Sequence, residues 1–267
     1  MKGDDNVATY VMSDIHGCLT EVKQMLELIN FSDSDRLIFA GDYVDRGPQS
    51  KEMLDWAMNA PKNMLFLRGN HDEWFANDIA TLEETSKQRT DLDDAYVAAM
   101  VLPSYYTFDP YKTISEFLHE KNVTIEDFVK YKDWIKSLPY YHKETINDKN
   151  FIIVHAGYID EKDFKRNCLY DTVEDYWLWA RDDAYYPNAG VKDTIIVAGH
   201  TPTVIPREFC YTDGDVYKQY NESLNCTLYD IDCGCVFGVR KCEDSETCKL
   251  ACIRLEDEEI FYIKPNR

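Results

Sequence analysis

Short apolar runs alternate with stretches of helical periodicity over the first quarter of the chain. Three runs of a length typical of a buried strand fall at residues 7–12, 36–40 and 64–67. Between them, apolar residues recur at helical spacing over residues 19–29 and 48–60, where Pro48 suits a first helical turn. The alternation predicts a βαβαβ unit with a parallel sheet.

The pattern changes further along the chain. Residues 78–137 contain helical stretches interrupted by PSYYTFDPY and no strand alternation, so we predict a helical cap inserted into a single domain of residues 1–267. Apolar runs at 151–154 and 194–198 predict two more buried strands. Residues 228–232, 250–255 and 260–263 predict a mostly antiparallel C-terminal sheet.

Composition excludes several classes of protein. The hydrophobic content of 45% is enough for a sizeable core, whereas the net charge of −20 repels nucleic acid and anionic membranes. No apolar stretch approaches the roughly 20 residues of a membrane span, and the start of the chain lacks a signal-peptide segment. We therefore predict no nucleic-acid partner, no membrane and a cytoplasmic location, and the oligomeric state stays open.

The chain has nine cysteines, an odd number that favours free thiols in a protein without an export signal. Six lie near the end of the chain, at Cys226, Cys233, Cys235, Cys242, Cys248 and Cys252. Paired CxxC spacing is absent, so the zinc signal is weak, and the spacing of Cys233 and Cys235 suits packing on one face of a strand. A disulfide between Cys242 and Cys248 stays an alternative.

Metal-type side chains follow each predicted strand. Asp14 and His16 follow the first, Asp42 the second, and Asn70 and His71 the third. The steps from Asp14 to Asp42 and from Asp42 to Asn70 are equal, about one βα unit each, so the chain returns to the same edge of the sheet. Two more histidines, His155 and His200, follow the next two strands.

Six of these side chains form a candidate ligand set, namely Asp14, His16, Asp42, Asn70, His155 and His200. A single aspartate among them would be an ordinary turn residue or helix cap, and a single histidine at a strand end would be an ordinary hydrogen-bonded polar group. Together, oxygen and imidazole ligands without cysteine suit two divalent ions such as Mn, Fe or Zn. Asp42 is central in the register, and we predict that it bridges both ions.

The blocks SDIHG, GDYVDRG, RGNHDE, VHAG and GHTP, in this order, resemble the signature of the phosphoprotein phosphatase (PPP) family of metallophosphatases. The resemblance spans residues 8–76 and 150–202, and IDCGCVFG resembles the last core strand of the family. Small bacterial and phage serine/threonine phosphatases are similar in length. Residues 78–137 match no motif of the family.

The resemblance implies an α/β (α+β) fold, the four-layer αββα sandwich of the calcineurin-like metallophosphatases. It implies one ion held by Asp14, His16 and Asp42, and a second held by Asp42, Asn70, His155 and His200. It also implies roles for the charged residues beside them: His71 as general acid paired with Asp45, and phosphate binding by Arg46, Asn70, His71 and the Arg181 of WLWARDD. Mn is the expected metal, with Fe and Zn open.

The activity implied is removal of phosphate from phosphoserine and phosphothreonine in proteins or peptides, by in-line attack of a metal-bridging hydroxide. Two alternatives stay open: hydrolysis of a dinucleoside polyphosphate such as diadenosine tetraphosphate, and a metal-dependent phosphoprotein-binding scaffold without turnover. Residues 77–137 carry seven lysines and arginines against twelve aspartates and glutamates. Because such a surface is poor for four phosphates, we expect protein substrates.

Overall fold

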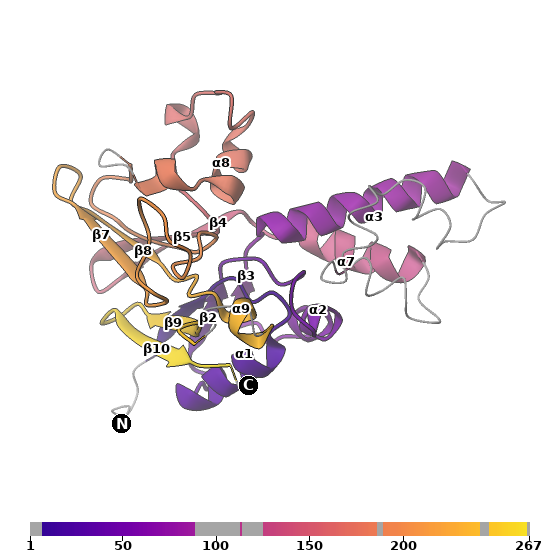
Figure 1. Ribbon diagram of the computed structural model, residues 1–267, viewed down its shortest axis with the longest axis horizontal. Helices are drawn as coiled ribbons and strands as arrows, with labels where there is room; N and C mark the ends of the chain where they lie inside the picture. Colours follow the sequence, from indigo (N-terminus) through magenta and orange to yellow (C-terminus); the bar gives the residue numbers. More distant parts are fainter. Residues whose placement is uncertain (1–6, 89–112, 114–124, 186–188, 241–245, 266–267) are drawn as a thin grey trace.

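Two five-stranded sheets form the centre of the molecule (Figure 1). The computed structural model describes residues 7–88, 113, 125–185, 189–240 and 246–265. The first sheet has the order β10-β9-β1-β2-β3 and contains β1 (Thr9–Met12), β2 (Arg36–Phe39), β3 (Met64–Phe66), β9 (Leu250–Arg254) and β10 (Glu259–Ile263). The strands β1, β2 and β3 are parallel, as predicted, and β9 is antiparallel to both β1 and β10.

The second sheet has the order β4-β5-β6-β8-β7. Its strands are β4 (Tyr141–Ile146), β5 (Lys149–Val154), β6 (Ile195–Ala198), β7 (Tyr217–Asn221) and β8 (Cys226–Asp230). The three central strands are parallel, and the outer strands β4 and β7 are antiparallel to their neighbours. Both edge strands alternate half-buried and exposed residues, and the weak apolar pattern left them unpredicted.

The two sheets face each other across an apolar core. Val11 and Ile38 of the first sheet pack in one cluster with Ile153 and Val197 of the second. The helices α1 (Leu19–Leu28) and α2 (Ser50–Met58) pack on the outer face of the first sheet. The helix α8 (Val173–Trp179) covers the outer face of the second sheet. Two short 3-10 helices, η1 (Glu161–Asp163) and η2 (Asp182–Tyr185), precede and follow α8 in the chain. The predicted four-layer αββα sandwich is confirmed.

The prediction of one antiparallel C-terminal sheet is wrong. β8 lies in the second sheet parallel to β6, whereas β9 and β10 lie in the first. An apolar run indicates a buried strand but does not specify its partner. IDCGCVFG is also not a strand, because the left-handed Gly234 (φ 71°) ends the extended chain and α9 (Cys235–Val239) begins. Consequently Cys233 packs between the sheets and Cys235 in the core beneath the helices, and the two do not share a strand face.

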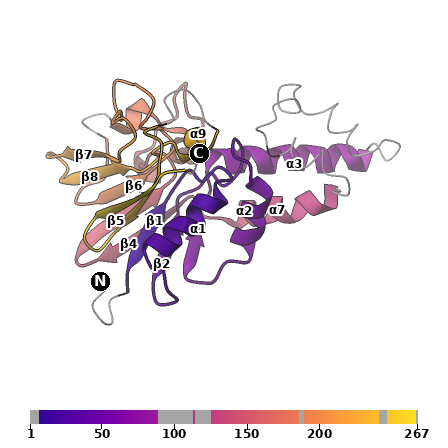
Figure 2. The same cartoon turned by 60° about the horizontal axis from the view of Figure 1, so that its bottom comes forward.

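The described part of the cap is a pair of helices. α3 (Asn70–Gln88) and α7 (Ile125–Ser137) lie side by side and extend away from the sheets (Figure 2). Ion pairs of Lys132 with Glu83 and of Lys136 with Glu73 join them. α3 begins at Asn70, before the expected boundary at residue 78, so its first turn belongs to the site. The stretch PSYYTFDPY lies outside the described residues.

Two predictions from composition can be compared with the described residues. Among these residues, no helix combines the length and the apolar character needed to cross a bilayer. The cytoplasmic location stays a prediction. Seven of the described cysteines are free thiols, namely Cys18, Cys168, Cys210, Cys226, Cys233, Cys235 and Cys252. The alternative of a disulfide between Cys242 and Cys248 stays a prediction, because Cys242 lies outside the described residues.

Candidate dinuclear metal centre

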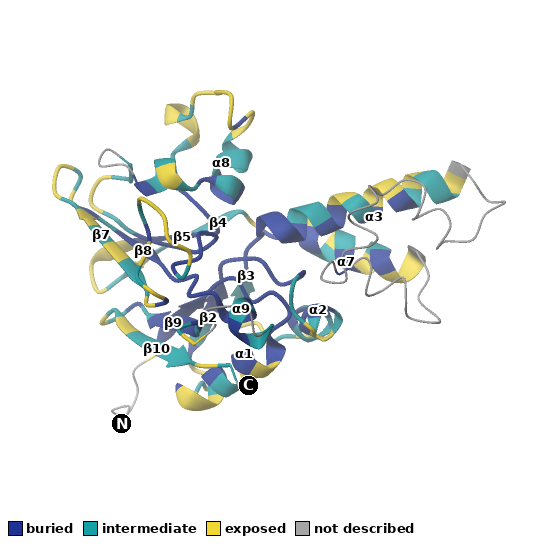
Figure 3. Cartoon of the chain, viewed as in Figure 1, coloured by how far each residue is buried: buried dark blue, intermediate teal, exposed yellow. Residues whose placement is uncertain are grey.

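The predicted ligands meet at the carboxyl ends of strands from both sheets. Asp14 follows β1, Asp42 follows β2, and Asn70 is the first residue of α3. His155 and His200 approach from the second sheet, after β5 and β6. His16, which lies two residues after Asp14, completes the set of six. All six residues are buried, and none is more than 4% exposed. Figure 3 shows the strands and the loops around this crevice as mostly buried.

The backbone of these loops is strained. Asp14, His16, Asp42 and His200 have positive φ values of 52°, 45°, 58° and 70°. Such a conformation is uncommon for residues other than glycine, and it persists only where the surrounding structure enforces it. The loops also approach each other closely, because a Cβ on Gly69 would lie 2.2 Å from both N and Oδ1 of Asp42. The sequence therefore uses strained turns and a glycine to crowd ligands together.

The tautomer of His16 leaves Nε2, the ring nitrogen that faces Asp42, able to act as a metal ligand. Nδ1 lies 2.8 Å from the carbonyl of Val44, to which it donates, so Nε2 carries the lone pair. Nε2 lies 3.3 Å from Oδ2 of Asp42. Burial, with the charge of Arg46, lowers the pKa of His16 well below its ordinary value. His16 is thus neutral, which is the form that binds metal ions.

His155 has the same arrangement. Its Nδ1 donates to the carbonyl of Ala40 at 2.9 Å, and its Nε2 lies 2.8 Å from Oδ1 of Asn70 and 3.5 Å from Oδ1 of Asp42. Burial lowers the pKa of His155, so its Nε2 is an acceptor that faces another acceptor. Two ligand atoms that each lie about 2.1 Å from the same cation would be separated from each other by a distance of this order.

Two further buried atoms have no hydrogen-bond partner among the described residues, Oδ1 of Asp14 and Nε2 of His200. Leaving a buried acceptor unsatisfied costs roughly 1–3 kcal/mol. Burial lowers the pKa of His200 well below its ordinary value, which keeps the imidazole neutral, the form that binds metal ions. Two divalent cations, one beside each atom, would satisfy them, and the residues present therefore fit metal ions.

Two sets of ligand atoms lie close enough to hold one ion each. His16, Asp42 and His71 form the first, and Asp42, His155 and His200 form the second, with the atoms of each set within 4.8 Å of one another. Asp42 belongs to both, as expected of a bridging ligand. His71 stands in the first set where the sequence predicted Asp14, whose Oδ1 is 4.0 Å from Nε2 of His16.

The residues predicted to act on the phosphate lie beside these ligands. Nδ1 of His71 is 2.7 Å from Oδ2 of Asp45. Arg46 directs Nη1 to Nε2 of His16 and Nη2 to Nε2 of His71, both at 2.7 Å. Its planar fork thus spans the two histidines, and the same donors can bind two phosphoryl oxygens.

Arg181 reaches the site from the segment that follows α8. Its Nη1 donates to the backbone carbonyl of His200 at 2.9 Å. Burial and the charge of Arg207 lower the pKa of Arg181, which is opposed by the charges of Asp232 and Asp14. All ten residues singled out by the sequence therefore lie in or beside one crevice.

Sequence reasoning missed two polar residues that organise this crevice. Asp72 is fully buried and accepts backbone N–H groups of Asp42, Tyr43 and Gly69 at 2.8–2.9 Å. Its position in the block RGNHDE could have marked it as a residue of the site. Thr113 binds Asp45 twice, donating its N–H to Oδ1 at 2.9 Å and accepting the N–H of Asp45 at 2.8 Å. No motif marks Thr113.

Aromatic rings adjoin the crevice. The centroid of Trp74 lies 5.3 Å from that of His71 and 4.5 Å from that of Trp179. Trp179 lies in turn 6.0 Å from His200. Trp179 therefore lies beside a histidine of the second set.

The sandwich and the crevice of oxygen and imidazole ligands define the class of metal-dependent phosphoesterases. A comparison with family models agrees, because residues 8–238 match the calcineurin-like phosphoesterases. The chain belongs to this family, whose members use a dinuclear metal centre.

The curated relatives match only a short segment. The chain is 46% identical over 67 residues to a symmetrical bis(5'-nucleosyl)-tetraphosphatase of Vibrio campbellii, and 45% identical over 67 residues to one of a Marinomonas species. The first match covers 25% of this chain and 25% of the relative, and the second covers 25% and 24%. The matched segment thus spans about a quarter of the curated relatives.

Solved structures resemble the whole chain at low identity. A structure provisionally named a diadenosine tetraphosphatase has a TM-score of 0.55 at 17% identity, covering 100% of this chain and 97% of the other. A metallophosphoesterase of Sphaerobacter thermophilus has a TM-score of 0.53 at 15% identity, covering 98% and 89%. At such identities the likeness establishes the fold alone.

Proposed function

We propose that the protein is a serine/threonine protein phosphatase that hydrolyses one phosphomonoester at the crevice. The observation that carries the proposal is the convergence of two arginines on the histidine pairs: Arg46 between His16 and His71, and Arg181 on His200. Two guanidinium groups can bind the oxygens of a single phosphoryl group. Phosphoproteins or phosphopeptides are then the substrates, and the charge of −20 disfavours a nucleic-acid partner.

The side chains of this chain have distinct tasks in that reaction. Two divalent ions, when bound, would activate water and stabilise charge on the phosphoryl group, and Mn is the proposed metal. Arg46 and Arg181 would orient the phosphoryl oxygens. Asp45 holds Nδ1 of His71. Nε2 accepts from Arg46 in this structure. When Arg46 turns to the phosphoryl oxygens of a substrate, a protonated Nε2 would donate its proton to the departing serine or threonine oxygen. An alkoxide is a strong base, so this proton matters.

A second candidate is symmetrical hydrolysis of a dinucleoside tetraphosphate. The names of the curated relatives support this alternative more than they support a protein phosphatase. Their matches, however, cover about a quarter of the chain. A chain of four phosphates would need more cationic groups than Arg46 and Arg181 provide, and the acidic surplus of residues 77–137 opposes it.

Parallel kinetics distinguish the candidates. Chelated protein, with and without added Mn²⁺, is assayed on a phosphoserine peptide, a phosphothreonine peptide and diadenosine tetraphosphate. We expect Mn²⁺-dependent release of phosphate with a higher kcat/KM for the peptides. Faster formation of ADP from the dinucleotide would favour the second candidate. Turnover of none of the substrates would favour the scaffold without catalysis.

A further inference from the structure

An open groove of about 420 Å³ lies beside the metal crevice. We call it the aromatic groove, and it is lined by Trp74, Cys168, Leu169, Tyr170, Asp171, Asp175 and Trp179. Leu169 is 71% exposed, which is unusual for a large aliphatic side chain. Its segment, which runs up to α8, forms one wall, and Trp74 of α3 contributes from the other side of the crevice.

The aromatic groove is continuous with the catalytic residues. Trp74 and Trp179 line it, and the same two rings contact His71 and His200 at centroid distances of 5.3 and 6.0 Å. An extended peptide advances about 3.3 Å per residue. A residue within about three positions of the phosphorylated one would therefore reach the groove.

The groove is acidic as well as aromatic. Both charged residues in its wall are carboxylates, Asp171 and Asp175. Asp175 is fixed in place because its Oδ2 accepts the backbone N–H groups of Asp171 and Thr172, in the capping box of α8. Asp171 pairs with Arg166 on the surface, where both side chains are more than 70% exposed, and such a pair exchanges readily with other partners.

We propose that the aromatic groove binds an arginine or lysine side chain of the substrate, close to its phosphoserine or phosphothreonine. Aromatic faces attract the cation, its aliphatic stem covers apolar surface such as Leu169, and the carboxylates neutralise the charge. The inference rests on the proposed protein phosphatase function and adds a sequence preference to it.

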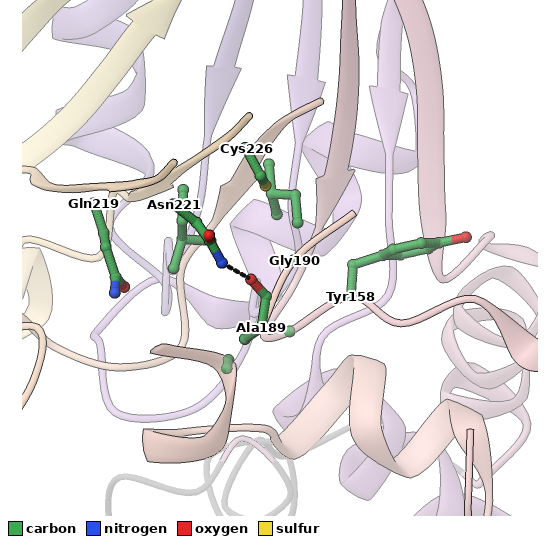
Figure 4. Close-up of a pocket in the computed structure, with 10 residues that line it drawn as sticks. Tyr158, Ala189, Gly190, Gln219, Asn221 and Cys226 are labelled. Carbon is green, nitrogen blue, oxygen red and sulfur yellow. Dashed lines mark hydrogen bonds between the residues drawn. The ribbon is translucent and has the colours of Figure 1, made fainter. Parts of the chain in front are cut away.

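A smaller cavity among the described residues does not suit this role. It shares no lining residue with the aromatic groove, is lined by residues such as Tyr158, Gly190 and Cys226, and measures about 20 Å³ (Figure 4). Asn221 donates to the carbonyl of Ala189 at its edge, at 3.2 Å. This space suits a single water molecule and not a side chain.

The test compares phosphoserine peptides that differ at one position, with arginine, alanine or glutamate placed in turn at each of the three residues on either side. At the best position we expect the Mn²⁺-loaded protein to prefer arginine over alanine about tenfold in kcat/KM, mainly through KM. The double variant Asp171→Asn/Asp175→Asn should reduce this ratio by about three- to fivefold, since an exposed charge pair contributes about this much while the aromatic faces remain. Since asparagine keeps an acceptor oxygen, the cap of α8 is retained. The ratio within one variant cancels any general loss of activity.

A matched control removes the same two charges elsewhere. Asp148 and Glu222 lie in exposed turns before β5 and β8, at the ends of the strands opposite the site. Asp148→Asn/Glu222→Gln should keep the wild-type ratio, which separates the groove from the overall field of the protein. Asp175→Glu should keep the preference, and Asp171→Lys should shift it toward glutamate. The wild-type ratio should fall as salt is raised.

Three results would overturn the inference, and they differ from one another. Equal rates for the arginine and alanine peptides at all positions would refute the groove while leaving the phosphatase function intact. An unchanged ratio in Asp171→Asn/Asp175→Asn would place the preference elsewhere. Hydrolysis of diadenosine tetraphosphate without hydrolysis of any phosphopeptide would refute the proposed function together with the inference, and would leave a nucleobase as the occupant of the groove.

Discussion

At the scale of single residues, Asp42 connects the two halves of the crevice. Its Oδ2 lies 3.3 Å from His16 and its Oδ1 lies 3.5 Å from His155. Its left-handed backbone and the close approach of Gly69 leave little space for another arrangement. Substitution of a ligand that both ions share should weaken the binding of both ions.

Asp42→Asn should therefore weaken Mn²⁺ binding at both positions, by about 100-fold or more, since even residues behind the ligands contribute 10–100-fold. Calorimetric titration of the chelated protein measures this directly. Asp35→Asn is the matched control, because Asp35 is equally buried but binds the turn at Ser32, outside the site. Loss of only one equivalent in Asp42→Asn would contradict a bridging role.

His71 and Arg46 should differ in their dependence on the leaving group. His71→Asn should lower kcat/KM for phosphoserine by about 100-fold or more, and for p-nitrophenyl phosphate by less than about tenfold, because the aryl oxygen leaves without a proton. Arg46→Ala should impair both substrates alike. Equal losses on both substrates in His71→Asn would exclude general acid catalysis by this residue.

At the scale of elements, the first turn of α3 joins the cap to the site. Asn70, His71 and Asp72 all lie in this turn, and Asp72 accepts three backbone N–H groups from the loops after β2 and β3. A buried carboxylate with three donors fixes the two loops relative to the helix. The position of His71 thus depends on how α3 begins.

Asp72→Ala should cost roughly 3 kcal/mol or more of the free energy of unfolding, since three buried donors lose their acceptor. Asp72→Asn should cost less, because one amide oxygen remains. Urea unfolding of chelated protein measures both without a contribution from metal binding. An Asp72→Ala midpoint equal to that of the wild type would show that the loops hold their geometry unaided.

The pairing of α3 with α7 should depend on pH. Glu83 hydrogen-bonds to Lys132 and Lys87, and these contacts lower its pKa to about 2. A folded-state pKa below the unfolded one gives stability above about pH 4.5, which is lost as the pH falls toward 2. Glu83→Gln should thus be less stable than wild type at pH 7, and the difference should shrink by pH 3.

The ion pair of Glu83 with Lys132 is only partly buried and open to solvent screening, so the effect is small, below about 1 kcal/mol. Glu84→Gln is the control, because Glu84 is the exposed neighbour on the same helix. It should change stability little at either pH. A Glu83→Gln difference that is constant from pH 7 to pH 3 would show that the pair with Lys132 does not stabilise the folded protein.

At the scale of the whole molecule, the strands that recur along the chain with the same local pattern could be predicted from the sequence. β1, β2, β3, β5 and β6 are short apolar runs, each followed by a metal-type side chain, so their common edge could be inferred. Pairing between residues far apart in the chain could not be inferred from the sequence. β9 pairs with β1 although most of the chain separates them, and Thr113 binds Asp45 from 68 positions away. Half-exposed strands such as β7 lack the apolar signal, and the aromatic groove arises only when α3 and α8 come together.

The central claim is that this crevice performs phosphoester hydrolysis with two ions that share Asp42. Stepwise titration of chelated protein with Mn²⁺, with phosphate release from a phosphoserine peptide measured after each addition, tests it most directly. We predict that turnover rises in proportion to the second equivalent and reaches its maximum at two equivalents per chain. Full turnover with one equivalent, or with none, would contradict the claim.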